Sequence, residues 1–224
     1  MTMPLELMTW FSPGFPVGAF AYSHGLEWAF EAGDVDDRAA LESWLDDCLR
    51  HGAGRNDAII LAHGMEAARR GDEAALDAVV ALSRALASSR ERRLETCMQG
   101  DAFLAAIDSG WSCPRVAAWR ERAAGETPYP VAVAIAAAAR DFETGTVLEA
   151  YLAAFIGNLV SAGIRLGIVG QTDGQRIIAA LLPCIRDVAA QAQAADISDL
   201  GGCVFAADLA AIAHETQYTR LFRS

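Results

Sequence analysis

The sequence of 224 residues contains no lysine: all 18 basic residues are arginine, against 29 acidic residues and a net charge of −11. A strongly acidic surface repels the phosphates of nucleic acids and the anionic head groups of lipids. We therefore expect neither a nucleic acid nor a membrane as a partner. A basic protein or a cation suits this charge better.

Motifs of catalysis and metal binding are also missing. The sequence has no GxxxxGK[ST] phosphate loop, no HExxH and no CxxC, and its histidines do not pair at helical spacing. Four carboxylates are expected on solvated helix faces: Asp46, Asp47, Glu91 and Glu95. The sequence thus predicts no enzyme active site, no cofactor and no closed metal site. Weak or shared metal binding at a subunit interface stays open.

The five cysteines are widely spaced and odd in number, which favours buried free thiols in a reducing cytoplasm. The first residues lack a basic segment followed by an apolar run, so we expect no signal peptide. The longest apolar stretch, 147–169, contains Glu149, Asn158 and Arg165. These polar residues favour a buried helix over a membrane span.

Apolar residues recur with helical spacing along nearly the whole chain, and no set of strands or repeat of fixed period is visible. We expect a helix around 41–49, with Asp36 or Asp37 as its cap and Gly52 after its end, and further helices near 57–70, 72–93, 96–107, 114–125, 131–142, 146–166, 176–195 and 200–214. Thr172 and Gln175 have the spacing of a capping box, and Pro183 predicts a kink or break. The predicted fold is one all-α domain, 1–224, of about eight to ten helices.

The segment 11–27, FSPGFPVGAFAYSHGLE, interrupts this helical pattern. Pro13 and Pro16 stiffen the backbone, Gly14 and Gly18 permit turns, and Ser23 can cap a helix that begins near residue 24. Four aromatic residues in it are available for display or burial: Phe11, Phe15, Phe20 and Tyr22. Two interpretations remain open, a loop that closes the helical core and a loop that docks a partner.

Two later segments also stand out. Residues 161–176 predict a tight turn between two helices rather than a nucleotide site, and Arg165 there needs a partner if it is buried. The end of the chain, 214–224, combines Tyr218, Leu221 and Phe222 with Arg220 and Arg223. Such a segment docks either on its own core or on a partner protein, and the residue types leave both open.

Together the three segments resemble the UreF family of urease accessory proteins. The resemblance rests on the series SP..PVG.F.YS.GLE in 11–27, on RL...GQ.DGQ in 161–176 and on HETQYTRLFRS in 214–224. The segment 41–130 matches mainly in helical character. The chain departs from the usual family pattern at Ala21, at His24 and at 167–169, which could alter the shape of these loops.

The resemblance implies an all-α cytoplasmic protein without enzymatic activity, commonly a homodimer. Such proteins join UreD (UreH in some species) and the GTPase UreG and support nickel insertion into apo-urease. The implied docking elements are the loop 11–27 and the tail 214–224. The residues expected to bind partners are Pro16, Gly18, Phe20, Tyr22, Tyr218, Arg220, Leu221 and Phe222.

Two alternatives remain. The chain could activate UreG with Arg220 or Arg165 as an arginine finger, or it could be a helical regulatory domain unrelated to urease. Because no role inside the molecule is visible for the tail, we expect that Arg220→Ala or removal of 217–224 leaves a folded protein that loses partner binding. Gly18→Val should disturb the loop, since a β-branched residue resists positive φ.

Overall fold

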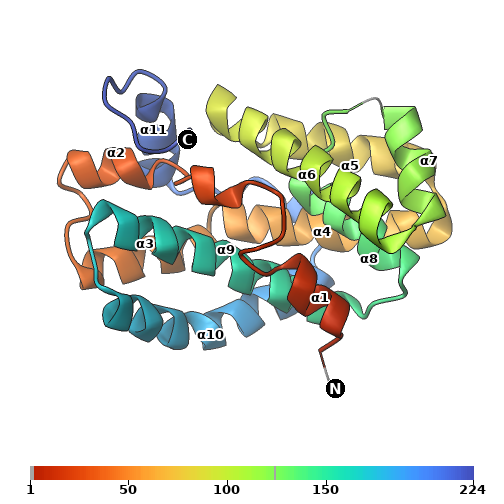
Figure 1. The fold of residues 1–224 in the computed structure, drawn as a ribbon, viewed down its shortest axis with the longest axis horizontal. Coiled ribbons are helices and arrows are strands. Elements are labelled where there is room, and N and C mark those ends of the chain that lie inside the picture. Colours follow the sequence, from red (N-terminus) through yellow and green to blue (C-terminus); the bar gives the residue numbers. More distant parts are fainter. Residues whose placement is uncertain (1–2, 124) are drawn as a thin grey trace.

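The computed structural model describes residues 3–123 and 125–224, and all regular structure in these ranges is helical. The all-α class expected from the sequence is confirmed (Figure 1). The elements are α1 (Leu5–Trp10), η1 (Ala19–Ala21), α2 (Leu26–Glu31), α3 (Arg38–Arg50), α4 (Ala53–Arg70), α5 (Glu73–Ala85), α6 (Arg90–Trp111), α7 (Pro114–Ala123), α8 (Tyr129–Ala139), α9 (Thr144–Leu166), α10 (Gln171–Ala194), η2 (Ile197–Asp199) and α11 (Phe205–His214).

Side-chain caps set the start of several helices. The side chains of Asp37, Asp72 and Ser89 each accept a hydrogen bond from the backbone three residues further on, at the starts of α3, α5 and α6. Each cap satisfies an amide that the helix itself leaves without an acceptor. The beginning of α6 matters below, because its first two turns carry several residues of the candidate site.

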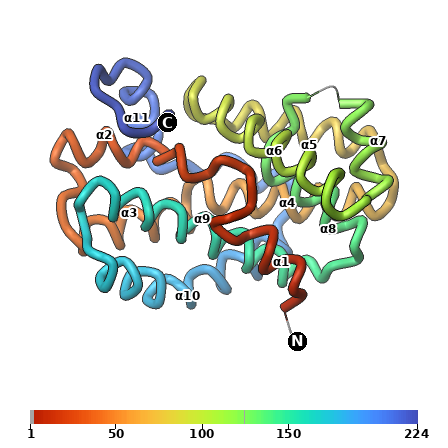
Figure 2. Tube along the Cα trace, viewed as in Figure 1, coloured from red at the N-terminus to blue at the C-terminus, as the bar shows by residue number. Residues whose placement is uncertain are grey.

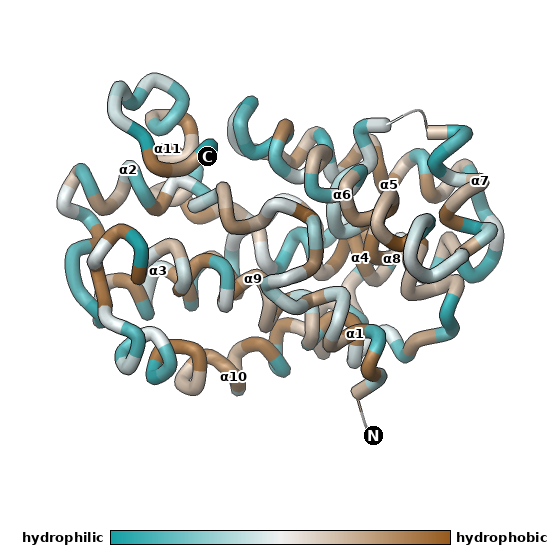
Figure 3. Tube along the Cα trace, viewed as in Figure 1, coloured by the Kyte–Doolittle hydropathy of each residue, from teal (hydrophilic) through white to brown (hydrophobic). Residues whose placement is uncertain are grey.

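The alanine-rich helix α8 lies at the centre of one half of the molecule, packed against α4 and α6. Small side chains allow neighbouring helices to approach α8 closely, and its residues from Pro130 to Ala138 are all buried. The other half is built around α9, which packs against α10 and α4. Figure 3 shows hydrophobic residues frequent along the inner helices α4 and α8 and hydrophilic residues frequent at the outer ends of α6 and α7.

Several predicted boundaries are wrong. The single helix expected over 72–93 is two helices, because the chain breaks between Ala85 and the cap Ser89. Helix α10 begins after Gly170 without a side-chain cap and continues through Pro183, so the expected capping box and break are absent. The short helix α1 was not expected at all. It packs Leu7 and Trp10 into the core.

Helices α9 and α10 are long and apolar enough to cross a membrane by length and composition alone. The two helices pack against each other, and α9 also contacts α4, α3 and α2. Residues 147–166 of this stretch therefore belong to a core helix, as the polar residues within it indicated, and the helix ends before Gly167. The expectation of buried thiols is confirmed for Cys48, Cys97, Cys113 and Cys184, and wrong for Cys203, which is exposed.

Candidate functional site

The two segments singled out from the sequence, the loop 11–27 and the tail 214–224, lie against each other. The amide and hydroxyl groups of Ser23 both donate to the backbone oxygen of Ser224, at 2.7 and 2.6 Å. The amide of Arg223 donates to the carbonyl of Ala21 at 2.8 Å. Figure 2 shows the end of the chain beside the segment that leads into α2. We call residues 11–27 and 214–224 together the loop–tail surface.

Glu27, at the start of α2, holds the tail in place. Its carboxylate accepts hydrogen bonds from the backbone amides of Leu221, at 2.5 Å, and Phe222, at 2.9 Å. The same carboxylate lies 3.2 Å from Nε2 of His214. The side chain of Glu27 is only 8% exposed, so these contacts are largely shielded from water. A buried carboxylate with several donors fixes the path of the segment that supplies them.

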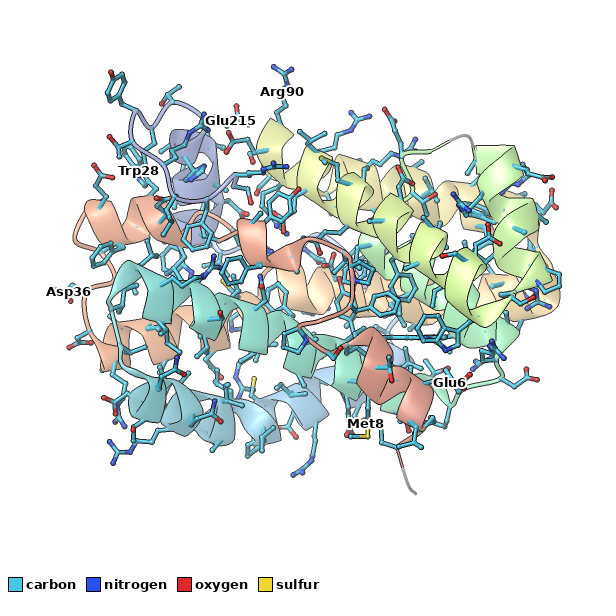
Figure 4. The ribbon with its side chains drawn as sticks, in the orientation of Figure 1. Glu6, Met8, Trp28, Asp36, Arg90 and Glu215 are labelled. Carbon is cyan, nitrogen blue, oxygen red and sulfur yellow. The ribbon has the colours of Figure 1, made fainter. Side chains whose placement is uncertain are left out.

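Glu91, at the start of α6, supplies a second anchor for the tail. One of its oxygens lies 2.7 Å from Nδ1 of His214, and the other accepts from Nη1 of Arg220 at 2.6 Å. The backbone amide of Glu91 also donates a hydrogen bond to the side-chain carboxylate of Glu215. Figure 4 shows Glu215 and Arg90 at these neighbouring ends of α11 and α6. The tail therefore docks on its own core, which is a role inside the molecule that the sequence did not reveal.

The predicted docking residues divide into buried and exposed members. Tyr22 and Phe222 are buried, and these two side chains support the loop and the tail from beneath. Three apolar side chains of the loop–tail surface face solvent instead, with exposed fractions of 65% for Phe20, 62% for Leu221 and essentially the whole side chain for Tyr218. Pro16 and Gly18 are exposed as well. The exposed members are available for contact with a partner.

Arg165, near the end of α9, links the loop to the tail. Its guanidinium carbon lies 3.5 Å from the ring centre of Phe20 and 4.2 Å from that of Phe222. The expected partner of this arginine is thus a pair of aromatic faces, while its Nη2 is buried without a hydrogen bond among the described residues. The stacked guanidinium holds the exposed Phe20 beside the buried Phe222.

Two glycines shape the loop. Gly18 has φ +76°. The prediction that Gly18→Val disturbs the loop depends on such a positive φ. Gly25 has φ +80°, and a Cβ placed there would lie 2.6 Å from the backbone nitrogen of Ala211 in α11. Only glycine satisfies both conditions at position 25. This close approach lets α2 and α11 pack together beneath the tail.

A cavity of about 620 Å³ opens beneath the loop. Its walls come from α1, the loop, α4, α6, α8, α9 and α10, and they are largely apolar. Polar side chains reach it from several elements: His24, Asp57, Arg92, Glu95 and Gln99. Arg92 donates to Glu95, His24 Nε2 lies 2.8 Å from Glu95, and the Tyr151 hydroxyl donates to Asp57 at 2.8 Å.

Burial and charge set the ionisation of this polar cluster. Burial alone would raise the pKa of Glu95, but Arg92 together with the contacts from His24 and Ser224 outweighs it and lowers the pKa to about 2. Burial and the same arginine lower the pKa of His24, so we assign this ring as neutral at pH 7. Burial raises the pKa of Asp57 to about 6. At pH 7 the cluster thus carries one excess negative charge, on Asp57.

Sequence reasoning missed several of these residues. Glu91 and Glu95 were expected on solvated faces, which is wrong: Glu95 is 1% exposed and both bind the loop or the tail. Met98, half-exposed on α6, lies 3.8 Å from the Tyr22 hydroxyl and extends the loop–tail surface onto that helix. Periodicity could not identify these carboxylates, because their partners in the tail, His214 and Ser224, lie more than a hundred residues away in the sequence.

Comparisons with known proteins agree with the family resemblance that the three segments indicated. A family model described as UreF matches residues 35–182. A urease accessory protein UreF from Methylobacterium radiotolerans is 52% identical over 220 residues, which cover 98% of this chain and 96% of that protein. The chain belongs to the UreF family. The resemblance noted in the sequence is thereby confirmed.

Other UreF proteins are similarly close. The urease accessory protein UreF of Rhodopseudomonas palustris strain BisA53 is 51% identical, over 98% of this chain and 92% of its own length. The urease accessory protein UreF of Xanthobacter autotrophicus is 50% identical, over 98% of this chain and 90% of its own length. The match to the UreF family model does not extend to the loop 11–27 or the tail 214–224, whereas these alignments cover nearly the whole chain. Among the described residues, no three histidine, cysteine or acidic side chains are grouped to hold a metal ion.

Proposed function

We propose that this chain is a non-catalytic urease accessory protein that binds UreD (or UreH) and the GTPase UreG and supports nickel insertion into apo-urease. The names of its relatives support the role in urease maturation. We further propose that it acts in the cytoplasm as a homodimer. The loop–tail surface is the proposed docking site for its partners.

The observation that carries this proposal is the union of the loop and the tail. Two segments from opposite ends of the chain are fixed by shared carboxylates, yet they leave Phe20, Tyr218 and Leu221 facing solvent. A rigid backbone that presents exposed aromatic and aliphatic side chains is typical of an interface, since little conformational entropy is lost on binding. A tail that served only the fold would not need these exposed apolar groups.

Co-purification with its own UreD and UreG tests the proposal. Because removal of 217–224 would also uncover the core beneath Phe222, single substitutions of exposed residues are better probes. We expect Phe20→Ala and Leu221→Ala to reduce recovery of the partners at least tenfold, the effect of losing an interface anchor of about 1.4 kcal/mol or more. Leu182→Ala is the matched control, since Leu182 is 40% exposed on α10, away from the tail (Figure 1).

The result that would overturn the proposal is equally direct. If the wild-type chain is folded but recovers neither UreD nor UreG, the docking function fails. If Leu221→Ala and Leu182→Ala reduce recovery equally, the loop–tail surface is not the docking site.

The arginine-finger alternative predicts that the chain raises GTP turnover by UreG. Arg220 pairs with Glu91, and Arg165 is stacked between two rings, so either residue would first have to leave these contacts. Turnover measured with and without the chain separates the two ideas, because a scaffold changes assembly without a large acceleration of hydrolysis. Family membership gives no support to a regulatory domain unrelated to urease.

A further inference from the structure

The cavity beneath the loop is lined by an unusual number of aromatic rings. Six aromatic side chains from four parts of the chain border it: Trp10, Phe11, Phe20, Tyr129, Tyr151 and Phe155. The rings of Phe11 and Tyr151 meet edge to face at 6.2 Å, and those of Tyr129 and Tyr151 lie 5.4 Å apart. Aromatic faces gathered around one space attract cations through their quadrupoles.

Among the described residues, the polar groups without a partner at this cavity are one donor, the Trp10 indole N–H, and two acceptors that lie with the polar cluster, on Asp57 and His24. Asp57 receives one hydrogen bond, from the Tyr151 hydroxyl to Oδ2, and its Oδ1 receives none from the described residues. The Nε2 of His24 faces Glu95, so in the neutral ring Nε2 carries the proton and Nδ1 is an acceptor. That Nδ1 is buried without a partner in the described part of the chain. A ligand that satisfies the two acceptors must supply hydrogen-bond donors, and a cationic N–H group also matches the charge of Asp57.

The charge balance of the cavity favours a cation as well. Arg92 (α6) is compensated by Glu95 (α6), which hydrogen-bonds it directly. The other groups that face Asp57 are uncharged at pH 7: Tyr129 of α8, Tyr151 of α9 and His24 of the loop. Arg92 also lowers the pKa of Asp57, on α4, but it is hydrogen-bonded to Glu95, so Arg92, Glu95 and Asp57 together carry one excess negative charge at pH 7.

From these observations we propose that the cavity binds a primary ammonium or guanidinium group carried on an apolar stem, with the head group at Asp57 and the stem against the rings of Tyr129 and Tyr151. Two sources share this chemistry, a free organic amine and a lysine or arginine side chain of a partner protein. The site lies inside the chain's own fold, so its existence does not depend on the partners proposed above.

Ligand titration followed by NMR tests the proposal on the full chain. The probes are n-butylammonium and its neutral counterpart n-butanol, together with a Gly-Lys-Gly peptide blocked at both ends and the same peptide with norleucine in place of lysine. We expect each cationic probe at pH 7.5 to bind at least tenfold more tightly than its neutral counterpart and to shift the ring signals of Tyr129 and Tyr151. Tighter binding of the lysyl peptide assigns the site to a partner's side chain, and tighter binding of n-butylammonium assigns it to a free amine.

Matched variants locate the binding. Asp57→Asn keeps the size of the side chain and should weaken binding of the cationic probes at least tenfold, whereas Asp36→Asn, at an exposed position far from Met8 at the cavity (Figure 4), should leave binding unchanged. Acidification should weaken cation binding, because a protonated Asp57 no longer attracts a cation. The pKa of Asp57, about 6, places this loss between pH 7 and pH 5.

Equal affinities for the cationic and neutral probes would overturn the proposal. So would unchanged affinity in Asp57→Asn, or binding to the wild-type chain that does not respond to pH. If Asp57→Asn does not fold, the comparison of charged and neutral probes on the wild-type chain decides the matter alone.

Discussion

Replacing Glu27 by glutamine should release the tail while the helical body remains folded. The Glu27 carboxylate accepts from the amides of Leu221 and Phe222 and lies against His214, almost without exposure to water. Glutamine keeps one acceptor oxygen but turns an NH₂ group toward donors. Hydrogen bonds to a charged group contribute about 1.5–3 kcal/mol each, and removal of one partner from a buried charged cluster costs about 3–5 kcal/mol.

A loss of about 4 kcal/mol is as large as two of the tail's remaining contacts together, while the hydrogen bonds between Ser224 and Ser23 and between Arg223 and Ala21 stay in place. Burial of the Phe222 side chain contributes about 1.5–3 kcal/mol, and the partly exposed Arg220–Glu91 pair contributes about 1 kcal/mol or less. The tail should therefore open far more often than in the wild-type chain. At 1.4 kcal/mol for each factor of ten, 4 kcal/mol corresponds to about 10³-fold faster amide exchange at Leu221 and Phe222.

Hydrogen exchange read by mass spectrometry of the last ten residues measures this opening. Helical circular dichroism should remain within a few per cent of the wild-type signal, because the tail contributes no helix after His214. Glu121→Gln is the matched control and should not change exchange, since Glu121 is exposed on α7 and has no hydrogen-bond or ion-pair partner among the residues that the structure describes. Wild-type exchange rates at Leu221 and Phe222 in Glu27→Gln would refute the assignment of this carboxylate as the anchor of the tail.

Three further predictions follow from the site. Burial raises the pKa of Asp57 from 3.8 to about 6, so the folded state binds a proton more tightly than the unfolded state. The free energy of unfolding should therefore fall as pH rises between about 4 and 6. Asp57→Asn has no carboxylate to ionise in the folded state, so in urea unfolding it should be more stable than the wild-type chain at pH 7 by up to about 3 kcal/mol. Gly25→Ala should destabilise the chain by at least about 2 kcal/mol in the same assay, because its Cβ would overlap the backbone of Ala211 at a positive φ. Arg220→Ala should keep its melting temperature within a few degrees, since its ion pair is partly exposed, and lose UreG in co-purification; retention of UreG would count against the tail as a docking element.

The helical class and most helix positions could be predicted from the sequence, because they depend on local periodicity and on capping residues such as Asp37 and Asp72. The predicted helix boundaries are wrong where tertiary packing determines them: α10 continues through Pro183, and α5 ends before Arg90. At these positions packing of the helix faces outweighs local preference.

The candidate site shows the same division. Residue types alone marked the loop 11–27 and the tail 214–224 as unusual, and the family resemblance came from their order along the chain. The local sequence pattern does not indicate that the two segments meet or that Glu27 and Glu91 hold the tail. It also does not indicate that Asp57 lies under the loop among aromatic rings. Those facts depend on contacts between residues far apart in the sequence, and only the packing of α2, α6, α9 and α11 brings such residues within hydrogen-bonding distance.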